Sequence, residues 1–312
     1  MKKTIIIFLG VIFLFSSLAM PQVQTQKVQQ EKKLQRLLPA RFINTAVSVQ
    51  NPFKPEFLLI KPLATDRPVV HPVLDFYQDS QAYENLFSTN GQSMLCAPAS
   101  LANALVYLKY NRNPRFEKIA AKHENRIHKN GDWVPLLFEV CKTDRDTGTY
   151  TEDMESTAKK LVAEGGYNTA DVYVKGAWAS DWNKLAAVTP DDLRKLCQEP
   201  DKAVVLVFGW YWTKLDQGKK VLQRNGGHCA ALAGYDALSP NVFYVSNPLT
   251  DYSQIYPLRY SRIELRQLAG DLEVPDHMKW FTGDLVGGNF AVLESILAVL
   301  PRPAFSAPKV AK

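Results

Sequence analysis

The stretch NGGHCAALAGYD, residues 225–236, is the most direct guide to how this chain of 312 residues folds. Two glycines followed by an apolar run predict a buried β-strand with His228 at its start. Alone, such a histidine is more often a satisfied core residue than a functional one. A second short strand, residues 242–245, ends at Asn247, where the following proline stiffens the turn. Neighbouring strands would place His228 and Asn247 side by side.

A cysteine lies far upstream, in QSMLCAPAS at residues 92–100. Leu101, Leu105 and Leu108 recur at intervals of four and three, and Pro98 suits a first helical turn, so Cys96 should begin a helix. The unpaired N–H groups and partial positive charge there favour the thiolate, which is the nucleophilic form. An isolated cysteine in this position is more often structural.

The spacing of the three residues favours a catalytic set. His228 follows Cys96 by 132 residues and precedes Asn247 by 19, and cysteine peptidases of the papain type have a similar Cys, His, Asn order and spacing. In such a set the histidine takes the thiol proton and the asparagine orients the imidazole.

The chain resembles the papain-like cysteine peptidases and, among them, the bacterial C39-like peptidases. The resemblance covers about half of the chain and rests on an ordered set of blocks: CAPAS at 96–100, TPDDL at 189–193, VVLVFGWY at 204–211, GGH at 226–228, GYD at 234–236 and VFYVSNP at 242–248. It implies hydrolysis of a peptide amide bond by a Cys96 thiolate, with His228 as general base and acid and Asn247 as the orienting residue.

Three positions depart from the family pattern. Ala97 follows the nucleophile where the family usually has glycine, and Asn247 stands where it often has aspartate. The family places an oxyanion-binding glutamine five or six residues before the cysteine, whereas here Gln92 lies four residues before it and Asn90 six. We expect Gln92 in that role, with Asn90 as the alternative.

The order of the elements predicts an α+β fold, with a helical half that carries the cysteine packed against an antiparallel sheet half that carries His228 and Asn247. Helices are expected from residue 96, from 152 to 164 with a cap at Thr149 or Thr151, and from 189 to 197. Strands are expected at residues 171–174, 203–212, 228–235 and 242–245. The aromatic residues 210–212 either line a cleft or, as we favour, pack in the core.

The other cysteines are Cys141, Cys197 and Cys229. They form no Cys-x-x-Cys pair and have no histidine at metal-ligand spacing, so we expect no metal site and no cofactor. Cys229 should point away from His228 into the sheet, which leaves Cys141 and Cys197 as the more favourable disulfide pair.

The two ends of the chain differ from its centre. Residues 1–19 read as a secretory signal peptide, 20–50 as a flexible leader or pro-segment rich in Gln and Lys, 51–300 as the peptidase domain and 301–312 as a disordered tail. The ends hold so many of the lysines and arginines that residues 46–300 are net acidic, although the whole chain has a formal charge of +6. We therefore expect no nucleic-acid partner.

The sequence thus predicts an exported, periplasmic or secreted cysteine peptidase that acts on a peptide or protein and is not stably inserted in a membrane after signal cleavage. Two alternatives keep the same fold. One is a catalytically silent protein that binds a peptide or a cell-wall component, and the other is an acyl transferase that uses the same thiol.

Overall fold

The structure is a computed structural model that describes residues 69–70, 78–79, 81–110, 118–119, 121–123, 133–177, 186–199, 202–249, 260–268, 272–273, 278–285 and 290–300. The expected signal peptide, leader and tail lie outside these residues. Within the described part, no helix is long and apolar enough to cross a membrane. The longer helices are α2 (Cys96–Tyr110), α4 (Val134–Val140), α5 (Thr151–Glu164) and α6 (Pro190–Gln198), and two short 3-10 helices are η2 (Gln81–Leu86) and η3 (Thr169–Asp171).

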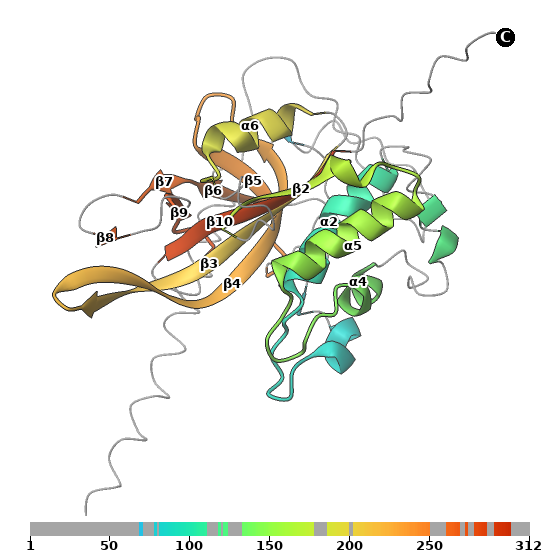
Figure 1. Ribbon diagram of the computed structural model, residues 1–312, viewed down its shortest axis with the longest axis horizontal. Coiled ribbons are helices and arrows are strands. Elements are labelled where there is room, and N and C mark those ends of the chain that lie inside the picture. The colour runs from blue at the N-terminus through green and yellow to red at the C-terminus, as the bar shows by residue number, and fades with distance from the viewer. Residues whose placement is uncertain are drawn as a thin grey trace, which may run out of the picture. The chain divides into compact units, whose positions relative to one another are not determined.

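The strands form one sheet (Figure 1). Its main path runs in the order β6-β5-β4-β3-β10-β9-β7, while β1 and β8 pair with β4 and β2 pairs with β10. The pairs are antiparallel except for a short parallel pair between β4 and β8. The bounds are β1 (Val69–Val70), β2 (Val172–Gly176), β3 (Ala203–Asp216), β4 (Lys219–Tyr235), β5 (Val242–Ser246), β6 (Ser261–Glu264), β7 (Arg266–Gln267), β8 (Leu272–Glu273), β9 (Trp280–Thr282) and β10 (Phe290–Val299).

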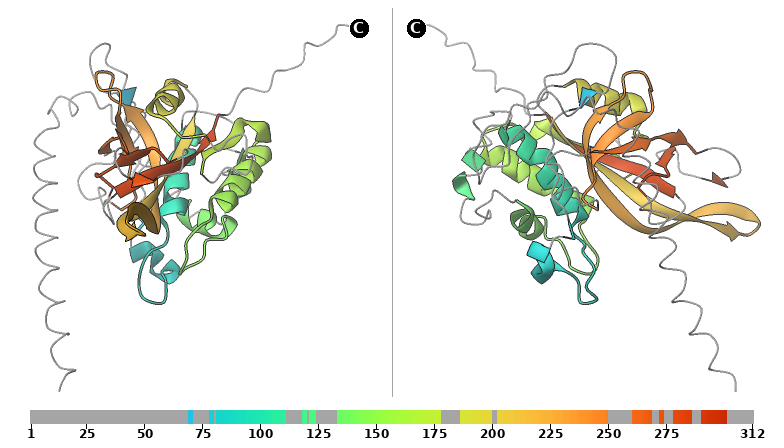
Figure 2. Two further views of the ribbon diagram at one scale, coloured as in Figure 1. Left: turned by 60° about the vertical axis from the view of Figure 1, so that its left-hand side comes forward. Right: turned by 180° about the vertical axis from the view of Figure 1, so that it is seen from behind.

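Alternation along the central strands divides the apolar residues between two cores. Val205 and Val207 of β3 pack with α2, α4 and α5 on one face. Leu206 and Phe208 pack with α6 and β5 on the other. Figures 1 and 2 show α2, α4 and α5 grouped together and α6 apart from them. The predicted combination of helices and an antiparallel sheet is therefore confirmed.

The strand β10 was not predicted. It pairs with β3 along its whole length and with β2 and β9 on its other side. Its side chains are buried on both faces from Ala291 onward, and a strand buried on both faces lacks the alternation by which strands are found in a sequence. The register of β10 and β3 shifts between Leu293 and Ser295, so Glu294 lies in a bulge.

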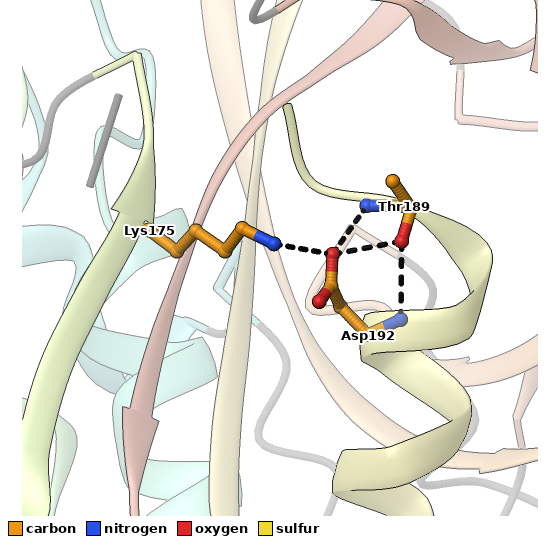
Figure 3. A network of polar contacts seen from close by, with 3 residues as sticks. All are labelled: Lys175, Thr189 and Asp192. Atoms are coloured by element: carbon orange, nitrogen blue, oxygen red, sulfur yellow. Dashed lines mark hydrogen bonds and ion pairs between the residues drawn. The ribbon is translucent and has the colours of Figure 1, made fainter. Parts of the chain in front are cut away.

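The helix α6 begins where the sequence predicted. The hydroxyl of Thr189 accepts the backbone N–H of Asp192, and the Asp192 carboxylate accepts the backbone N–H of Thr189 at 2.9 Å, which forms a capping box. The ammonium group of Lys175, on β2, donates to the same carboxylate oxygen at 2.6 Å (Figure 3). The cap thus also joins α6 to the sheet.

The helix α5 differs from the prediction at its start. Its N-cap is Tyr150, which makes no side-chain cap, so the expected capping threonine is wrong. The hydroxyl of Thr149 bonds instead to that of Thr143, at 2.7 Å. The end is as predicted: Gly165 is the C-cap, and Gly166 has a φ of 77°, which glycine adopts without strain.

Candidate active site

Cys96 is the first residue of α2 and is half-buried. Leu95 and Ala97 on either side of it are buried in the core that lies against α2. The neighbouring apolar side chains fix the sulfur at the helix start, where the backbone N–H groups of the first turn have no partner within the helix. On α2, the Nδ2 atom of Asn103 donates to Oγ of Ser246 at 3.0 Å, and this buried bond joins the helix to the end of β5.

His228 and Asn247 come together across two paired strands. Ala231 of β4 pairs with Ser246 of β5, so Asn247 follows β5 close to His228. The Nε2 atom of His228 lies 2.8 Å from Oδ1 of Asn247, and both residues are buried. On β3, the ring of Trp210 stacks on His228 with centroids 5.8 Å apart and an interplanar angle of 16°. The imidazole is therefore held at its edge and on its face.

The pKa of the Cys96 thiol lies well below its ordinary value. A hydrogen bond from the Cys229 thiol is the largest cause, and burial opposes it. A hydrogen bond from His228, the charge of His228 and the backbone N–H of Cys229 lower the pKa further. Cys229 and His228 therefore stabilise the Cys96 thiolate.

Cys229 points away from His228, as the strand alternation predicted. It pairs with Val207 and belongs to the core beneath α2, whereas His228 pairs with Phe208 of the opposite core. The contact with Cys96 was not predicted, because the sequence does not show which face of the sheet α2 covers. The hydrogen bond to Cys96 and burial raise the pKa of the Cys229 thiol well above its usual range.

All four cysteines are free, so the predicted bridge between Cys141 and Cys197 is wrong. Cys141 lies in the core beneath α2 and Cys197 in the opposite one, so the sheet separates them. Burial raises the pKa of each of these two thiols to about 12.

Gln92 and Asn90 lie in the turn that precedes α2, and both are exposed. The backbone N–H of Gln92 donates to Oγ of Ser88 at 2.9 Å and to Oδ1 of Asn90 at 3.3 Å. Oδ1 of Asn90 also accepts a short bond from the Ser88 hydroxyl. The Asn90 carboxamide therefore stabilises its own turn, and the oxyanion role of Gln92 stays a prediction.

A different carboxamide, that of Gln78, is buried beside the site. The backbone N–H of Gln78 donates to the carbonyl of Pro248, next to Asn247, at 2.9 Å. Its carbonyl accepts the hydroxyl of Ser93, three residues before Cys96, at 3.0 Å. Among the residues that the structure describes, its Oε1 atom has no hydrogen-bond partner and its Nε2 atom makes one contact, with Asp79 at 3.5 Å. Gln78 was missed because η2 and a turn lie between it and the cysteine.

Among the described residues, no group of three or more His, Cys, Asp and Glu side chains is placed to hold a metal ion.

Comparison with known proteins identifies the family of this chain. Residues 73–267 match the model of the Peptidase_C39 like family. No curated protein matches the chain. A crystal structure of a candidate C39-like peptidase from Bacillus anthracis is similar at 14% identity and a TM-score of 0.37, over 75% of this chain and 98% of that one. That likeness is too weak to support an inference, but the family match spans more than half of the sequence. The chain belongs to the C39-like peptidase family.

Proposed function

We propose that this protein is an exported cysteine peptidase that hydrolyses a peptide amide bond with Cys96, His228 and Asn247 in a papain-like arrangement. The observation that carries the proposal is the depressed pKa of Cys96 beside an imidazole whose far nitrogen is held by Asn247 at 2.8 Å. Family membership supports peptide hydrolysis as the reaction. A silent binding protein has no need of an activated thiol.

The residues support a reaction in two halves. The Cys96 thiolate attacks the scissile carbonyl carbon, and a C–S bond forms while the carbonyl electrons move to oxygen. The protonated imidazole of His228 then donates its proton to the leaving nitrogen, the C–N bond breaks, and an acyl-enzyme remains. In the second half His228 takes a proton from water, the hydroxyl attacks the thioester, and the acid product and the thiolate are released.

We propose that Gln78 binds the oxyanion together with the backbone N–H of Cys96. A buried amide side chain with little hydrogen bonding of its own is a preorganised donor for developing negative charge. The bonds of its backbone to Pro248 and Ser93 keep it next to the turns that carry Asn247 and Cys96.

Intact-mass analysis of the enzyme during turnover of a fluorogenic peptide ester tests the proposal. We expect an added acyl mass on wild type, mapped to Cys96, and neither acyl mass nor turnover for Cys96→Ala. A folded Cys96→Ala enzyme with wild-type turnover would refute the thiol mechanism. Acylation of Cys96 whose product is an amide formed with an added amine, rather than an acid, would favour the transferase alternative.

A further inference from the structure

An ion pair between a buried carboxylate and a partly exposed arginine lies on the same face of the sheet as the contact between Cys229 and Cys96. Glu294, in the β10 bulge, is fully buried and accepts from Nε and Nη2 of Arg224 on β4, at 2.8 and 3.1 Å. The hydroxyl of Tyr211 donates to the same carboxylate at 2.5 Å. Burial and the nearby Glu294 raise the pKa of Tyr211, so its hydroxyl stays protonated as a donor.

Two glycines make room for this pair. Gly209 of β3 and Gly227 of β4 are register partners, next to the Phe208–His228 pair. A methyl group at Gly227 would lie 2.7 Å from Nη2 of Arg224, and one at Gly209 would collide with the Glu294 carboxylate. The guanidinium group therefore lies directly over Gly227, and the carboxylate lies over Gly209.

This position is close to the thiol. Gly227 and Cys229 are two apart on β4 and so share a face, about 7 Å from each other. The charges of Glu294 and Arg224 both act on the Cys229 thiol, and that thiol bonds to Cys96. We infer that an extended peptide bound at Cys96 brings one of its first few residues to the guanidinium group. Although Glu294 beneath it is fully buried, 41% of the Arg224 side chain is exposed.

The arrangement is costly if it serves stability alone. A buried carboxylate beside two glycines in strands contributes less to stability than apolar side chains of similar volume would. Its distinctive product is a partly exposed arginine side chain whose guanidinium group is oriented by the bonds of its Nε and Nη2 atoms to Glu294. A fixed guanidinium recognises a planar carboxylate by paired hydrogen bonds, a geometry that a flexible lysine cannot match.

We propose that Arg224 forms an anion-recognising subsite beside Cys96, which selects peptides with a carboxylate side chain within a few residues of the scissile bond. The proposal rests on the peptidase function proposed above and adds the substrate class. Glu294 is a positioning residue for this subsite, and it belongs to β10, C-terminal to residues 73–267 that match the family.

Peptidyl epoxysuccinates test the subsite without a known substrate. The thiolate opens the epoxide: a C–S bond forms, a C–O bond breaks and the alkoxide takes a proton. Peptide can be attached at either end of the epoxysuccinyl group. Probes with Glu or Gln at each of the first three positions on both sides are compared by their second-order rates of labelling Cys96. We expect the Glu probe to label wild type about 10-fold faster than the Gln probe at one position, as one charge-assisted pair predicts.

The variants identify the source of the preference. Arg224→Gln combined with Glu294→Gln leaves no buried charge and should bring the two rates within about twofold of each other. Arg224→Lys keeps the charge and the pairing with Glu294, and should still lose most of the preference. Arg262→Gln is the matched control and should keep it, because Arg262 on β6 is 42% exposed and pairs only loosely with Glu264, at 3.9 Å.

Two results overturn the subsite. One is equal rates for Glu and Gln at every position in a wild-type protein whose Cys96 reacts normally with iodoacetamide. The other is a preference that survives in Arg224→Lys and in the double variant. Failure of the peptidase function itself looks different, since Cys96 would then react with neither iodoacetamide nor any probe at neutral pH.

Discussion

The oxygen of Asn247 determines which nitrogen of His228 carries the proton. Oδ1 of Asn247 lies 2.8 Å from Nε2 of His228 and also accepts the backbone N–H of Leu249 at 3.2 Å. An atom that accepts from a backbone N–H is the amide oxygen, so Nε2 must be the donor. The Nδ1 atom is thereby left for the sulfur of Cys96.

Removing this orientation should weaken turnover without abolishing it. We expect Asn247→Ala to lower kcat by about 10 to 1000-fold, equivalent to roughly 1.4 to 4 kcal/mol, while Cys96→Ala and His228→Ala fall to background. Asn247→Asp keeps the acceptor and adds a negative charge, which should favour the imidazolium and move the alkaline limb of kcat upward in pH. Steady-state kinetics from pH 5 to 10 measure both effects, and an Asn247→Ala enzyme as inactive as Cys96→Ala would contradict an orienting role.

The reactivity of Cys96 should depend on Cys229. In the native protein, iodoacetamide should label Cys96 far faster than the other three thiols, whose pKa values are all raised. Burial raises those of Cys141 and Cys197, and the hydrogen bond to Cys96 together with burial raises that of Cys229. Cys229→Ala removes the hydrogen bond that most lowers the Cys96 pKa, so its alkylation midpoint should move to higher pH. Cys229→Ser retains a donor and should move it less.

Mass-spectrometric alkylation rates across pH 4–10 give these midpoints, and an unchanged midpoint in Cys229→Ala would exclude the contribution of Cys229.

The lowered pKa of Cys96 also determines how this group changes the free energy of unfolding with pH. Because the folded protein releases the Cys96 proton at lower pH than the unfolded chain does, this group's contribution is fully present above the unfolded pKa. It is lost as the pH falls through the folded pKa.

Two glutamines near the site should behave differently. Gln78→Ala removes the buried amide donor and should lower kcat by about 100 to 1000-fold with little change in KM. Gln92→Ala alters an exposed side chain whose turn is held by backbone bonds, and should lower kcat less than twofold. If the two effects were reversed, the oxyanion role would return to Gln92. Circular dichroism of each variant is the control for folding.

The cap of α6 should contribute to stability but not to chemistry. Thr189→Ala removes the hydroxyl that accepts from the Asp192 N–H and donates to its carboxylate, and should cost about 1 kcal/mol of unfolding free energy in urea. Although burial raises the pKa of Asp192, the bonds from Lys175 and Thr189 hold it below its usual value. Its contribution is therefore present above the unfolded pKa of about 4 and is lost as the pH falls through the folded value. Equal urea midpoints for wild type and Thr189→Ala would contradict this.

The sequence predicts local features of this fold better than distant ones. The Thr189 cap and the Gly165 helix end are encoded by neighbouring residues, and both are correct. The pairing of β4 with β5 follows from their closeness in the chain. In contrast, Phe290–Val299 is buried on both faces and mixes helix-forming with strand-forming residues, so that only pairing with β3 and β2 determines its conformation.

The same distinction holds for the candidate site. The positions of Cys96, His228 and Asn247 follow from motif order, whereas Cys229 was expected in the sheet without any link to the thiol. Tertiary packing decides which core lies against α2. It also decides the burial of Gln78, which is farther from Cys96 in the sequence than a short motif extends. Glu294 and Arg224 meet across three strands, and no spacing within the chain predicts such a pair.

The place of β10 has a consequence for the order of assembly. It is the last of the described strands to leave the ribosome, and yet it lies between β3 on one side and β2 and β9 on the other. In a nascent chain that lacks β10, the strands β2, β3 and β9 have no shared partner strand, and Arg224 has no Glu294 to pair with. Closure of the sheet therefore waits until residues 290–299 have been synthesised, and until then β2, β3 and β9 cannot be joined through a shared partner strand.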